Sequence, residues 1–298
     1  MQKLYDIIVI TGPTATGKTS LATKLASEID GEIISADSRQ VYKNMNIGTG
    51  KDLHDYVVDD KKINHYLIDI VEPGYHYNVF EFQKDFVNAY NEIANKGKKP
   101  ILCGGTGMYI EAALAGYKLI EVPENKDLRK SLSKKSMQEL INMLSGLTKL
   151  HNKSDTTDKN RLIRAIEIET FYKENPNIKT ELPKLKPIIF AVNLPREVVR
   201  ERITKRLRQR LDAGMIKEVE DLLNSGLKPQ QLTYYGLEYK YITNYLTGDI
   251  TFDEMFKSLN TAIHQFAKRQ MTWFRRMERK GFDIIWVKSY DEIKNHIF

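Results

Sequence analysis

Short apolar runs alternate with helical patterns through the first part of the chain. The apolar runs predict strands at residues 7–10, 32–35, 65–71 and 100–103. Runs this short and this apolar are typical of strands that are buried on both faces. Apolar residues at helical spacing predict helices at residues 20–29 and 79–95. The alternation predicts an α/β fold, in which a parallel sheet carries helices on both faces.

The pattern changes near Pro123. Residues 121–158 are polar, rich in Lys and Ser and without a β-like run, which predicts a small helical insertion domain. Further along, strands are predicted at 188–194 and, at a sheet edge, at 284–287, and helices at 159–172, 197–213, 216–223 and 252–276. The helix at 159–172 is expected to return to the core. We therefore expect a core of residues 1–120 and 159–298 with an insertion at 121–158.

A glycine-containing loop follows the first predicted strand. Its residues are Gly12, Pro13, Thr14, Ala15, Thr16, Gly17, Lys18 and Thr19, which match G-x-x-x-x-G-K-[ST] without a gap between a strand and a helix. Backbone N–H groups, the helix N-terminus and Lys18 can hold phosphate oxygens, and the Thr19 hydroxyl can ligate Mg²⁺. The motif predicts a diphosphate or triphosphate ligand and a sheet like that of the P-loop nucleoside-triphosphate hydrolases.

Polar residues follow two further predicted strands. Asp37 comes after residues 32–35, and Thr106 after residues 100–103. The carboxyl ends of parallel strands face the ligand crevice, so we expect both side chains near the phosphate loop. Asp37 could be a general base or a metal ligand, or it could form an Asx turn. Thr106 could be a turn residue between glycines, and Asp69 could hold Mg²⁺ or be a satisfied buried carboxylate.

Charge and composition narrow the class of partner. The net charge is +7, and two stretches are strongly basic: residues 196–211 hold seven Lys/Arg and two Glu, and residues 268–280 hold six Lys/Arg and one Glu. Solvated helix faces also give such runs, but beside a phosphate-binding motif they favour nucleic acid. We expect a cytoplasmic protein, because no apolar run approaches the roughly 20 residues of a membrane span and no signal peptide is evident. Cys103 is the only cysteine, which excludes an intramolecular disulfide.

Five ordered segments resemble the tRNA dimethylallyltransferases, also called isopentenyl-diphosphate:tRNA transferases. The segments are residues 12–19, 34–42 with 47–51, 65–70, 100–110 and 266–274. The phosphate loop alone is shared with many unrelated enzymes. The sequences DSRQVY at 37–42, GGTGMYI at 104–110 and AKRQMTWF at 267–274 are much more specific. The resemblance spans nearly the whole chain.

This resemblance implies a reaction and a catalytic set. A dimethylallyl group would pass from dimethylallyl diphosphate to the exocyclic amine of the adenosine 3′ to the anticodon of a tRNA, with that adenine flipped out. Asp37 matches the family's base, and Thr106 matches a channel residue that contacts the adenosine. Arg206 matches an arginine that faces the diphosphate. Arg206 would stabilise the leaving diphosphate together with Lys18 and with a Mg²⁺ ion bound by Thr19.

The resemblance also implies which residues contact tRNA. The matching positions are Asp37, Ser38, Arg39, Gln40, Thr106, Arg129, Asn160, Arg161, Leu162, Ile163 and Arg164, and the insertion is expected to belong to this surface. Lys268 and Arg269 are expected to contact the RNA backbone. Affinity should depend strongly on salt, because it comes largely from neutralised phosphates. We expect the enzyme to act as a monomer.

The chain departs from the family pattern at three places. Gly236-Leu237-Glu238-Tyr239 stands where the family usually has Gly-Tyr-Lys-Glu, and His264 stands where it usually has an arginine. The insertion is also shorter than is typical. We expect all three departures to belong to the tRNA side and to leave the diphosphate side intact.

Two other function classes share part of the pattern. An ATP-dependent small-molecule or nucleotide kinase would share the phosphate loop and the aspartate after the second strand. It would not need a basic C-terminal helix that carries Trp273 and Phe274. A non-catalytic RNA-binding module would need no base at Asp37. The six scattered histidines and one cysteine give no credible zinc site.

Overall fold

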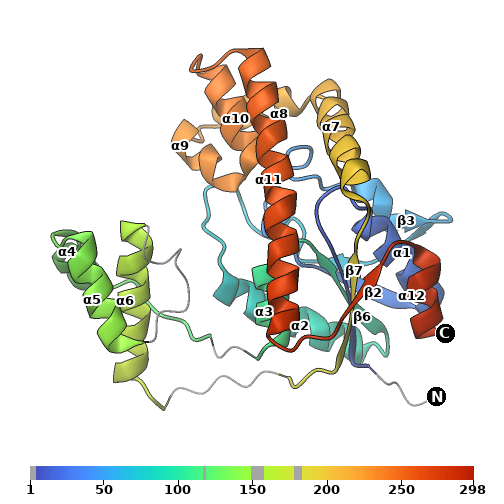
Figure 1. The fold of residues 1–298 in the computed structure, drawn as a ribbon, viewed down its shortest axis with the longest axis horizontal. Coiled ribbons are helices and arrows are strands. Elements are labelled where there is room, and N and C mark those ends of the chain that lie inside the picture. The colour runs from blue at the N-terminus through green and yellow to red at the C-terminus, as the bar shows by residue number, and fades with distance from the viewer. Residues whose placement is uncertain (1–4, 117–118, 149–157, 178–182) are drawn as a thin grey trace. The chain divides into compact units, whose positions relative to one another are not determined.

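The computed structural model describes residues 5–116, 119–148, 158–177 and 183–298 (Figure 1). The chain forms two compact units. The first spans Met1–Tyr117 and Pro183–Phe298, and the second spans Lys118–Leu182. In the described parts of both units, none of the helices has the length and apolar character needed to cross a membrane.

A six-stranded parallel sheet forms the centre of the first unit. In spatial order its strands are β5 (His65–Tyr66), β2 (Gly31–Ser35), β6 (Lys99–Gly104), β1 (Ile7–Thr11), β7 (Pro187–Val192) and β8 (Ile284–Val287). A separate antiparallel pair is formed by β3 (Val57–Val58) and β4 (Lys61–Lys62). The parallel α/β sheet predicted from the sequence is confirmed, and so is the edge position of residues 284–287.

Helices cover both faces of this sheet (Figure 1). The described helices of the first unit are α1 (Lys18–Ile29), α2 (Val79–Asn95), α3 (Gly107–Leu114), α7 (Arg196–Asp212), α8 (Met215–Asn224), α9 (Pro229–Leu232), α10 (Leu237–Leu246), α11 (Phe252–Arg279) and α12 (Tyr290–Ile297), with short 3₁₀ turns η1 (Leu53–Tyr56) and η3 (Thr233–Tyr235). In β1, Ile7 and Val9 belong to the core that includes α2, α3 and α11, while Ile8 and Ile10 belong to the core with α1 and α12. Alternate side chains point to opposite faces, so a strand covered on both faces needs a continuous apolar run.

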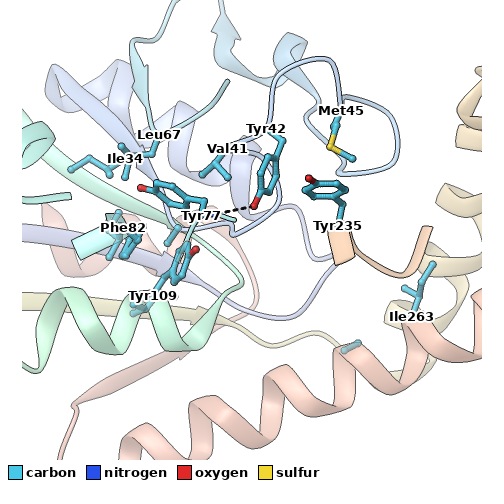
Figure 2. Close-up of a cluster of buried hydrophobic side chains, with 14 of the residues drawn as sticks. Ile34, Val41, Tyr42, Met45, Leu67, Tyr77, Phe82, Tyr109, Tyr235 and Ile263 are labelled. Atoms are coloured by element: carbon cyan, nitrogen blue, oxygen red, sulfur yellow. Dashed lines mark hydrogen bonds between the residues drawn. The ribbon is translucent and has the colours of Figure 1, made fainter. Parts of the chain in front are cut away.

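The core under α2 and α3 contains a group of tyrosines (Figure 2). The rings of Tyr42 and Tyr235 meet edge to face with their centroids 4.6 Å apart. The hydroxyl of Tyr42 accepts a hydrogen bond of 3.2 Å from the backbone N–H of Tyr77. Tyr42 is fully buried and lies five residues after Asp37. Its packing therefore anchors the segment that follows β2.

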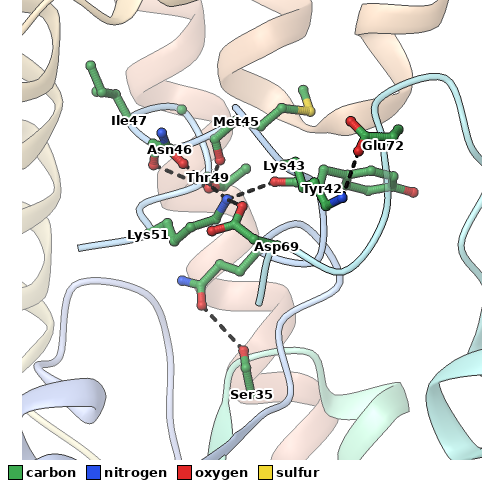
Figure 3. A network of polar contacts seen from close by, with 12 residues as sticks. Ser35, Tyr42, Lys43, Met45, Asn46, Ile47, Thr49, Lys51, Asp69 and Glu72 are labelled. Carbon is green, nitrogen blue, oxygen red and sulfur yellow. Dashed lines mark hydrogen bonds and ion pairs between the residues drawn. The ribbon is translucent and has the colours of Figure 1, made fainter. Parts of the chain in front are cut away.

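The strand predicted at 65–71 is wrong beyond Tyr66. Leu67 and Asp69 have φ angles of 63° and 56°, in the left-handed region, which ends the extended backbone. Asp69 forms an ion pair with the fully buried ammonium of Lys51, which also donates a 2.7 Å hydrogen bond to the carbonyl of Tyr42 (Figure 3). The buried cation needs this anion. Asp69 is therefore a paired carboxylate and not a free strand-end ligand for Mg²⁺.

The second unit is helical and larger than the insertion predicted from the sequence. It contains α4 (Lys126–Ser133), α5 (Met137–Leu147) and α6 (Lys159–Glu174). Leu162 and Ile166 of α6 pack with Leu132 of α4 and Leu140 of α5 in one small core. Since α6 buries its apolar face here, the boundary lies after α6 and not at residue 158. Residues 149–157 of the predicted insertion lie outside the described residues.

Candidate active site

Three segments meet at the carboxyl edge of the sheet because they follow neighbouring strands. The phosphate loop follows β1, the segment with Asp37 follows β2, and the segment with Thr106 follows β6, which lies between the other two. The segments after β2 and β6 approach each other closely, since a Cβ on Gly104 would lie 2.3 Å from the carbonyl oxygen of Ala36. Only glycine leaves room for this approach. The topology thus brings the predicted base and adenosine contact to the phosphate loop.

The phosphate loop is held by its own polar groups. The Thr16 hydroxyl and the Lys18 ammonium each donate a 2.8 Å hydrogen bond to the carbonyl of Pro13. Gly12 has φ 142°, and a Cβ there would lie 2.8 Å from the carbonyl oxygen of Val192 in β7. α1 begins at Lys18, so its positive N-terminal end closes the loop. Burial lowers the pKa of Lys18 to about 8.

A cavity of about 680 Å³ opens beside the phosphate loop. Lys18 and Thr19 line it from the loop and α1, Asp52 from the segment before η1, and Arg206 and Arg210 from α7. Arg206 donates a 2.5 Å hydrogen bond to the carboxylate of Asp52. Cations from two separate elements therefore surround one space, which is the arrangement that a diphosphate requires.

Asp37 and Thr106 are both tied to the segment after β2. Oδ1 of Asp37 accepts a 2.9 Å hydrogen bond from the N–H of Arg39, which is the Asx turn considered as an alternative. The Thr106 hydroxyl accepts a 3.1 Å hydrogen bond from the N–H of Ser38 and lies 3.4 Å from the Ser38 hydroxyl. The turn uses one carboxylate oxygen of Asp37, and the second can accept a proton. The structural and catalytic interpretations of Asp37 are therefore compatible.

Arg39 and Gln40 extend this segment. The side-chain amide of Gln40 donates a 3.1 Å hydrogen bond to the carbonyl of Gly50 and accepts one of 3.3 Å from Ser35. The Arg39 guanidinium lies over the ring of Tyr234, 5.2 Å from its centroid. Both side chains are half-buried, so their contacts shape the segment as well as its surface.

The second unit holds Arg129 and residues 160–164, which are also expected to contact tRNA. Arg129 and Arg164 both pair with Glu167, whose side chain is 2% exposed. Burial alone would raise the pKa of Glu167, but hydrogen bonds from the two arginines and from the N–H of Asn125 hold it below its usual value. The guanidinium groups of Arg129 and Arg164 thus have structural partners within the helical unit.

Two residues of this unit that were expected to contact tRNA are buried. Leu162 and Ile163 are buried in the helical core, at 0% and 7% exposure. Their side chains therefore pack within the unit and are not part of an RNA-facing surface, which corrects the expectation for these two positions. Asn160 and Arg161 are exposed on the same helix. In α11 of the first unit, Lys268 and Arg269 are likewise exposed.

Three residues near the phosphate loop were missed by the motifs. Gln270 hydrogen-bonds to the loop at Thr14, and Arg210 and Glu238 line a second, smaller cavity beside Thr14 and Ala15. Burial raises the pKa of Glu238, and the charge of Arg210 opposes this shift. Glu238 thus lies beside the phosphate loop, where its departure from the family pattern was not expected from the sequence.

Arg210 could have been found from its spacing. It follows Arg206 by four residues on one helix, so both side chains face the same way. Among the described residues, Nε and Nη2 of Arg210 have no hydrogen-bond partner, although Nη2 lies 3.7 Å from the carboxylate of Asp52. Glu238 and Gln270 had no such signal, because α10 and α11 are distant from the loop in sequence.

The residues present fit a magnesium ion that is shared with a diphosphate. Within the described residues, no group of three or more His, Cys, Asp or Glu could hold a metal by itself. Mg²⁺ is commonly held by one or two protein ligands together with phosphate oxygens and water. The Thr19 hydroxyl stands beside the phosphate-binding space, and Asp52 and Asp55 line the same cavity. This oxygen donor set suits such a shared site.

Comparisons with known proteins agree with this geometry. A family model described as IPP transferase matches residues 40–277, and one described as isopentenyl transferase matches residues 5–73. The chain is 57% identical to tRNA dimethylallyltransferase 2 of Bacteroides fragilis over 285 residues, covering 96% of this chain and 93% of that protein. It is 58% identical to tRNA dimethylallyltransferase 2 of Phocaeicola vulgatus, with the same coverage. These matches favour the prenyl transfer over the kinase alternative.

Solved structures give the same result for the fold. A crystal structure of a tRNA isopentenylpyrophosphate transferase from Bacillus halodurans is 30% identical, with a TM-score of 0.70, and covers 98% of this chain and 95% of that chain. A eukaryotic dimethylallyltransferase acting on tRNA has a TM-score of 0.77 at 23% identity, covering 96% of this chain and 74% of that chain, and supports the fold alone. On the family model and the identity to full-length relatives, the chain belongs to the tRNA dimethylallyltransferase (IPP transferase) family.

Proposed function

We propose that this enzyme transfers a dimethylallyl group from dimethylallyl diphosphate to the exocyclic amine of the adenosine 3′ to the anticodon of tRNA. The observation that carries the proposal is the convergence of three segments at one edge of the sheet. Asp37 and Thr106 are joined to each other through Ser38, and both follow strands that neighbour the phosphate loop. An alkyl transfer needs a base and a leaving-group site on opposite sides of one carbon, and this edge supplies both.

The nucleophile needs help because its lone pair is delocalised into the adenine ring. In the proposed reaction, the amine nitrogen bonds to the allylic carbon while the bond from that carbon to the diphosphate oxygen breaks. Asp37 orients the amine and accepts its proton, and the Asx turn holds the carboxylate in place. Thr106 contacts the flipped adenosine from the neighbouring segment.

The diphosphate gains negative charge as the bond breaks. Lys18 and Arg206 line the space beside the phosphate loop from two elements, and Arg210 adds a third cation there. The loop N–H groups and the N-terminus of α1 add fixed positive potential. A magnesium ion held by Thr19 and the phosphate oxygens would supply further charge neutralisation.

The tRNA is proposed to contact both units. Ser38, Arg39, Gln40, Lys268 and Arg269 would act in the first unit, and Arg129, Asn160, Arg161 and Arg164 in the second. The support is the exposure of Asn160, Arg161, Lys268 and Arg269 and the position of residues 37–40 beside Thr106. We also propose a cytoplasmic monomer, because a single chain carries the phosphate loop, the base and the arginines.

The direct test is incorporation of labelled dimethylallyl groups into bacterial tRNA with Mg²⁺ present. Wild-type enzyme should label the RNA. Asp37→Asn keeps the turn acceptor but removes the base, so the rate should fall by roughly 10²–10⁴-fold. A matched control is Asp249→Asn in the turn after α10, which should leave the rate unchanged. Absence of label with wild-type enzyme would refute the function, and full activity of Asp37→Asn would refute only the role of Asp37.

A further inference from the structure

One buried side chain joins the two segments that carry the substrates. Gln270 lies on α11 and is 7% exposed. Its Oε1 accepts a 2.8 Å hydrogen bond from the N–H of Thr14 in the phosphate loop, and its Nε2 donates a 2.8 Å hydrogen bond to the carbonyl of Gly105. Both partners are backbone groups, so their donor and acceptor roles are fixed. The orientation of the amide follows from those roles.

Only a few side chains could form this bridge. The site requires an acceptor and a donor on one planar group that is long enough to span both segments. Asparagine is shorter by one methylene, and a carboxylate has no donor. The segment after β6 also makes room for it, because a Cβ on Gly105 would lie 2.4 Å from Nε2 of Gln270. Gly105 and Gln270 are therefore complementary in shape as well as in hydrogen bonding.

The bridge rests on a rigid element. α11 runs from Phe252 to Arg279, and on either side of Gln270 it buries Ala267, Phe274 and Met277 in the core of the first unit. Thr14 belongs to the loop that holds the diphosphate. Gly105 precedes Thr106, the proposed adenosine contact. One amide on a packed helix thus links these two segments beyond the end of the β1–β6 pairing.

We propose that Gln270 is a positioning residue, which holds the phosphate loop and the adenosine-contacting segment at the separation that the transfer requires. This inference rests on the proposed function, since it assigns the two segments to the two substrates. The amine and the allylic carbon must approach to about 3–3.5 Å before reaction, and a misplacement of about 1 Å can lower the rate on the order of 10²-fold. Gln270 touches neither reacting atom, and its effect is on kcat.

The decisive test compares two substitutions at this position. Gln270→Met has a similar length but neither hydrogen bond, so kcat should fall roughly 10–100-fold at every pH while KM for dimethylallyl diphosphate changes much less. Gln270→Glu accepts from Thr14 as a carboxylate but can donate to Gly105 only when protonated. Its kcat relative to wild type should therefore rise as the pH falls. All other groups of the site are the same in both enzymes, so the ratio isolates the new carboxyl group.

Controls separate this role from general effects. Gln265→Met, at an exposed position on the same helix, should behave as wild type. A carboxylate near the loop also repels the diphosphate, which raises KM as well as lowering kcat, whereas a loss of positioning lowers kcat with little change in KM. KM for dimethylallyl diphosphate is therefore measured at each pH. Wild-type labelling of tRNA is measured alongside, so failure of the proposed function is seen separately.

Three results would overturn the proposal. The first is a folded Gln270→Met enzyme whose kcat is within about twofold of wild type, because a loss of positioning should lower kcat by more than that. The second is a Gln270→Glu to wild-type ratio of kcat that does not change with pH. If Gln270→Met does not fold, the ratio measured on Gln270→Glu decides. The third is that neither variant folds, because the side chain then serves folding and the positioning role fails.

Discussion

The phosphate-binding edge of the sheet and the helical unit both gather charged side chains, but the partners of those side chains differ. At the sheet edge, Lys18, Arg206 and Arg210 line a cavity. In the helical unit, Arg129 and Arg164 converge on the buried carboxylate of Glu167. The first set faces a space of about 680 Å³, and the second stabilises a contact between helices.

This difference shows how a basic residue should be interpreted. A charge that lines a cavity beside phosphate-binding N–H groups is available to a ligand, whereas a charge paired with a buried carboxylate mainly satisfies that carboxylate. Arg129 and Arg164 are proposed to contact tRNA, yet both also form ion pairs with Glu167. Removing the two kinds of charge should therefore give two kinds of defect.

The largest expected effect is at the phosphate loop. Lys18→Ala removes a cation beside the site of developing diphosphate charge, so kcat/KM should fall by roughly 10²–10³-fold. Thermal stability should change little, because Lys18 hydrogen-bonds only within its own loop at Pro13. Steady-state kinetics and a thermal melt of the same sample measure the two quantities. A large loss of stability with little loss of rate would break the comparison.

The next effect is on the stability of the helical unit. Glu167→Ala removes the shared partner of Arg129 and Arg164, and we expect it to destabilise this unit by roughly 2 kcal/mol, reduced from the fully buried case because both arginines are partly exposed. The pKa of Glu167 is held low, so its stabilisation is present at neutral pH and is lost as the pH falls through that lowered value. Thermal melts of Glu167→Ala are compared with those of Glu174→Ala, a control substitution at an exposed position on the same helix. Affinity for dimethylallyl diphosphate should be unchanged.

A smaller effect is expected from pH alone. The pKa of Lys18 lies at about 8 because the ammonium is buried. The ammonium is charged below that value and loses its charge above it, so kcat/KM for dimethylallyl diphosphate should fall by up to about tenfold per pH unit above pH 8. In Lys18→Arg the guanidinium stays charged, so this alkaline decrease should disappear even if the absolute rate is lower. A decrease that persists in Lys18→Arg would assign it to another group.

The smallest effect concerns the exposed basic residues. Arg161→Ala should weaken tRNA binding by a few-fold and lower the slope of log affinity against log salt by about 1. Arg129→Ala should in addition lower thermal stability, because its guanidinium is bonded to Glu167. Filter binding across a salt series and thermal melts, made on both variants, distinguish the effect on tRNA binding from the effect on stability. A salt slope for Arg161→Ala equal to that of wild type would contradict its role as a phosphate contact.

Most of the fold could be predicted because its signals are local. The helix at 79–95 and the edge strand at 284–287 agree with the predicted bounds, and the phosphate loop joins β1 to α1 as expected. The strand at 65–71 failed because its apolar residues do not reveal that Leu67 and Asp69 adopt left-handed backbone. Residues 159–172 were correctly predicted as helical, but periodicity does not state which core an apolar face will join.

The part of the candidate site that lies at strand ends could be predicted from the sequence. Asp37, Thr106 and the phosphate loop each follow a strand, and the rule for parallel sheets brings them together. Glu238 and Gln270 were not predictable in this way. Both lie on helices far along the chain, and their contacts with the loop at Thr14 depend on how α10 and α11 pack.

By itself, the sequence determined the α/β class, the phosphate loop, the candidate base and the family to which the chain belongs. These follow from short-range patterns, in which spacing along the chain is also spacing in space. The tertiary structure decided which charges pair with each other and which line a cavity. It also placed Glu238 beside the phosphate loop and Gln270 between two segments. The two contacts of Gln270 join residues more than 150 positions apart, and they arise only when side-chain packing selects one arrangement of the helices over the sheet.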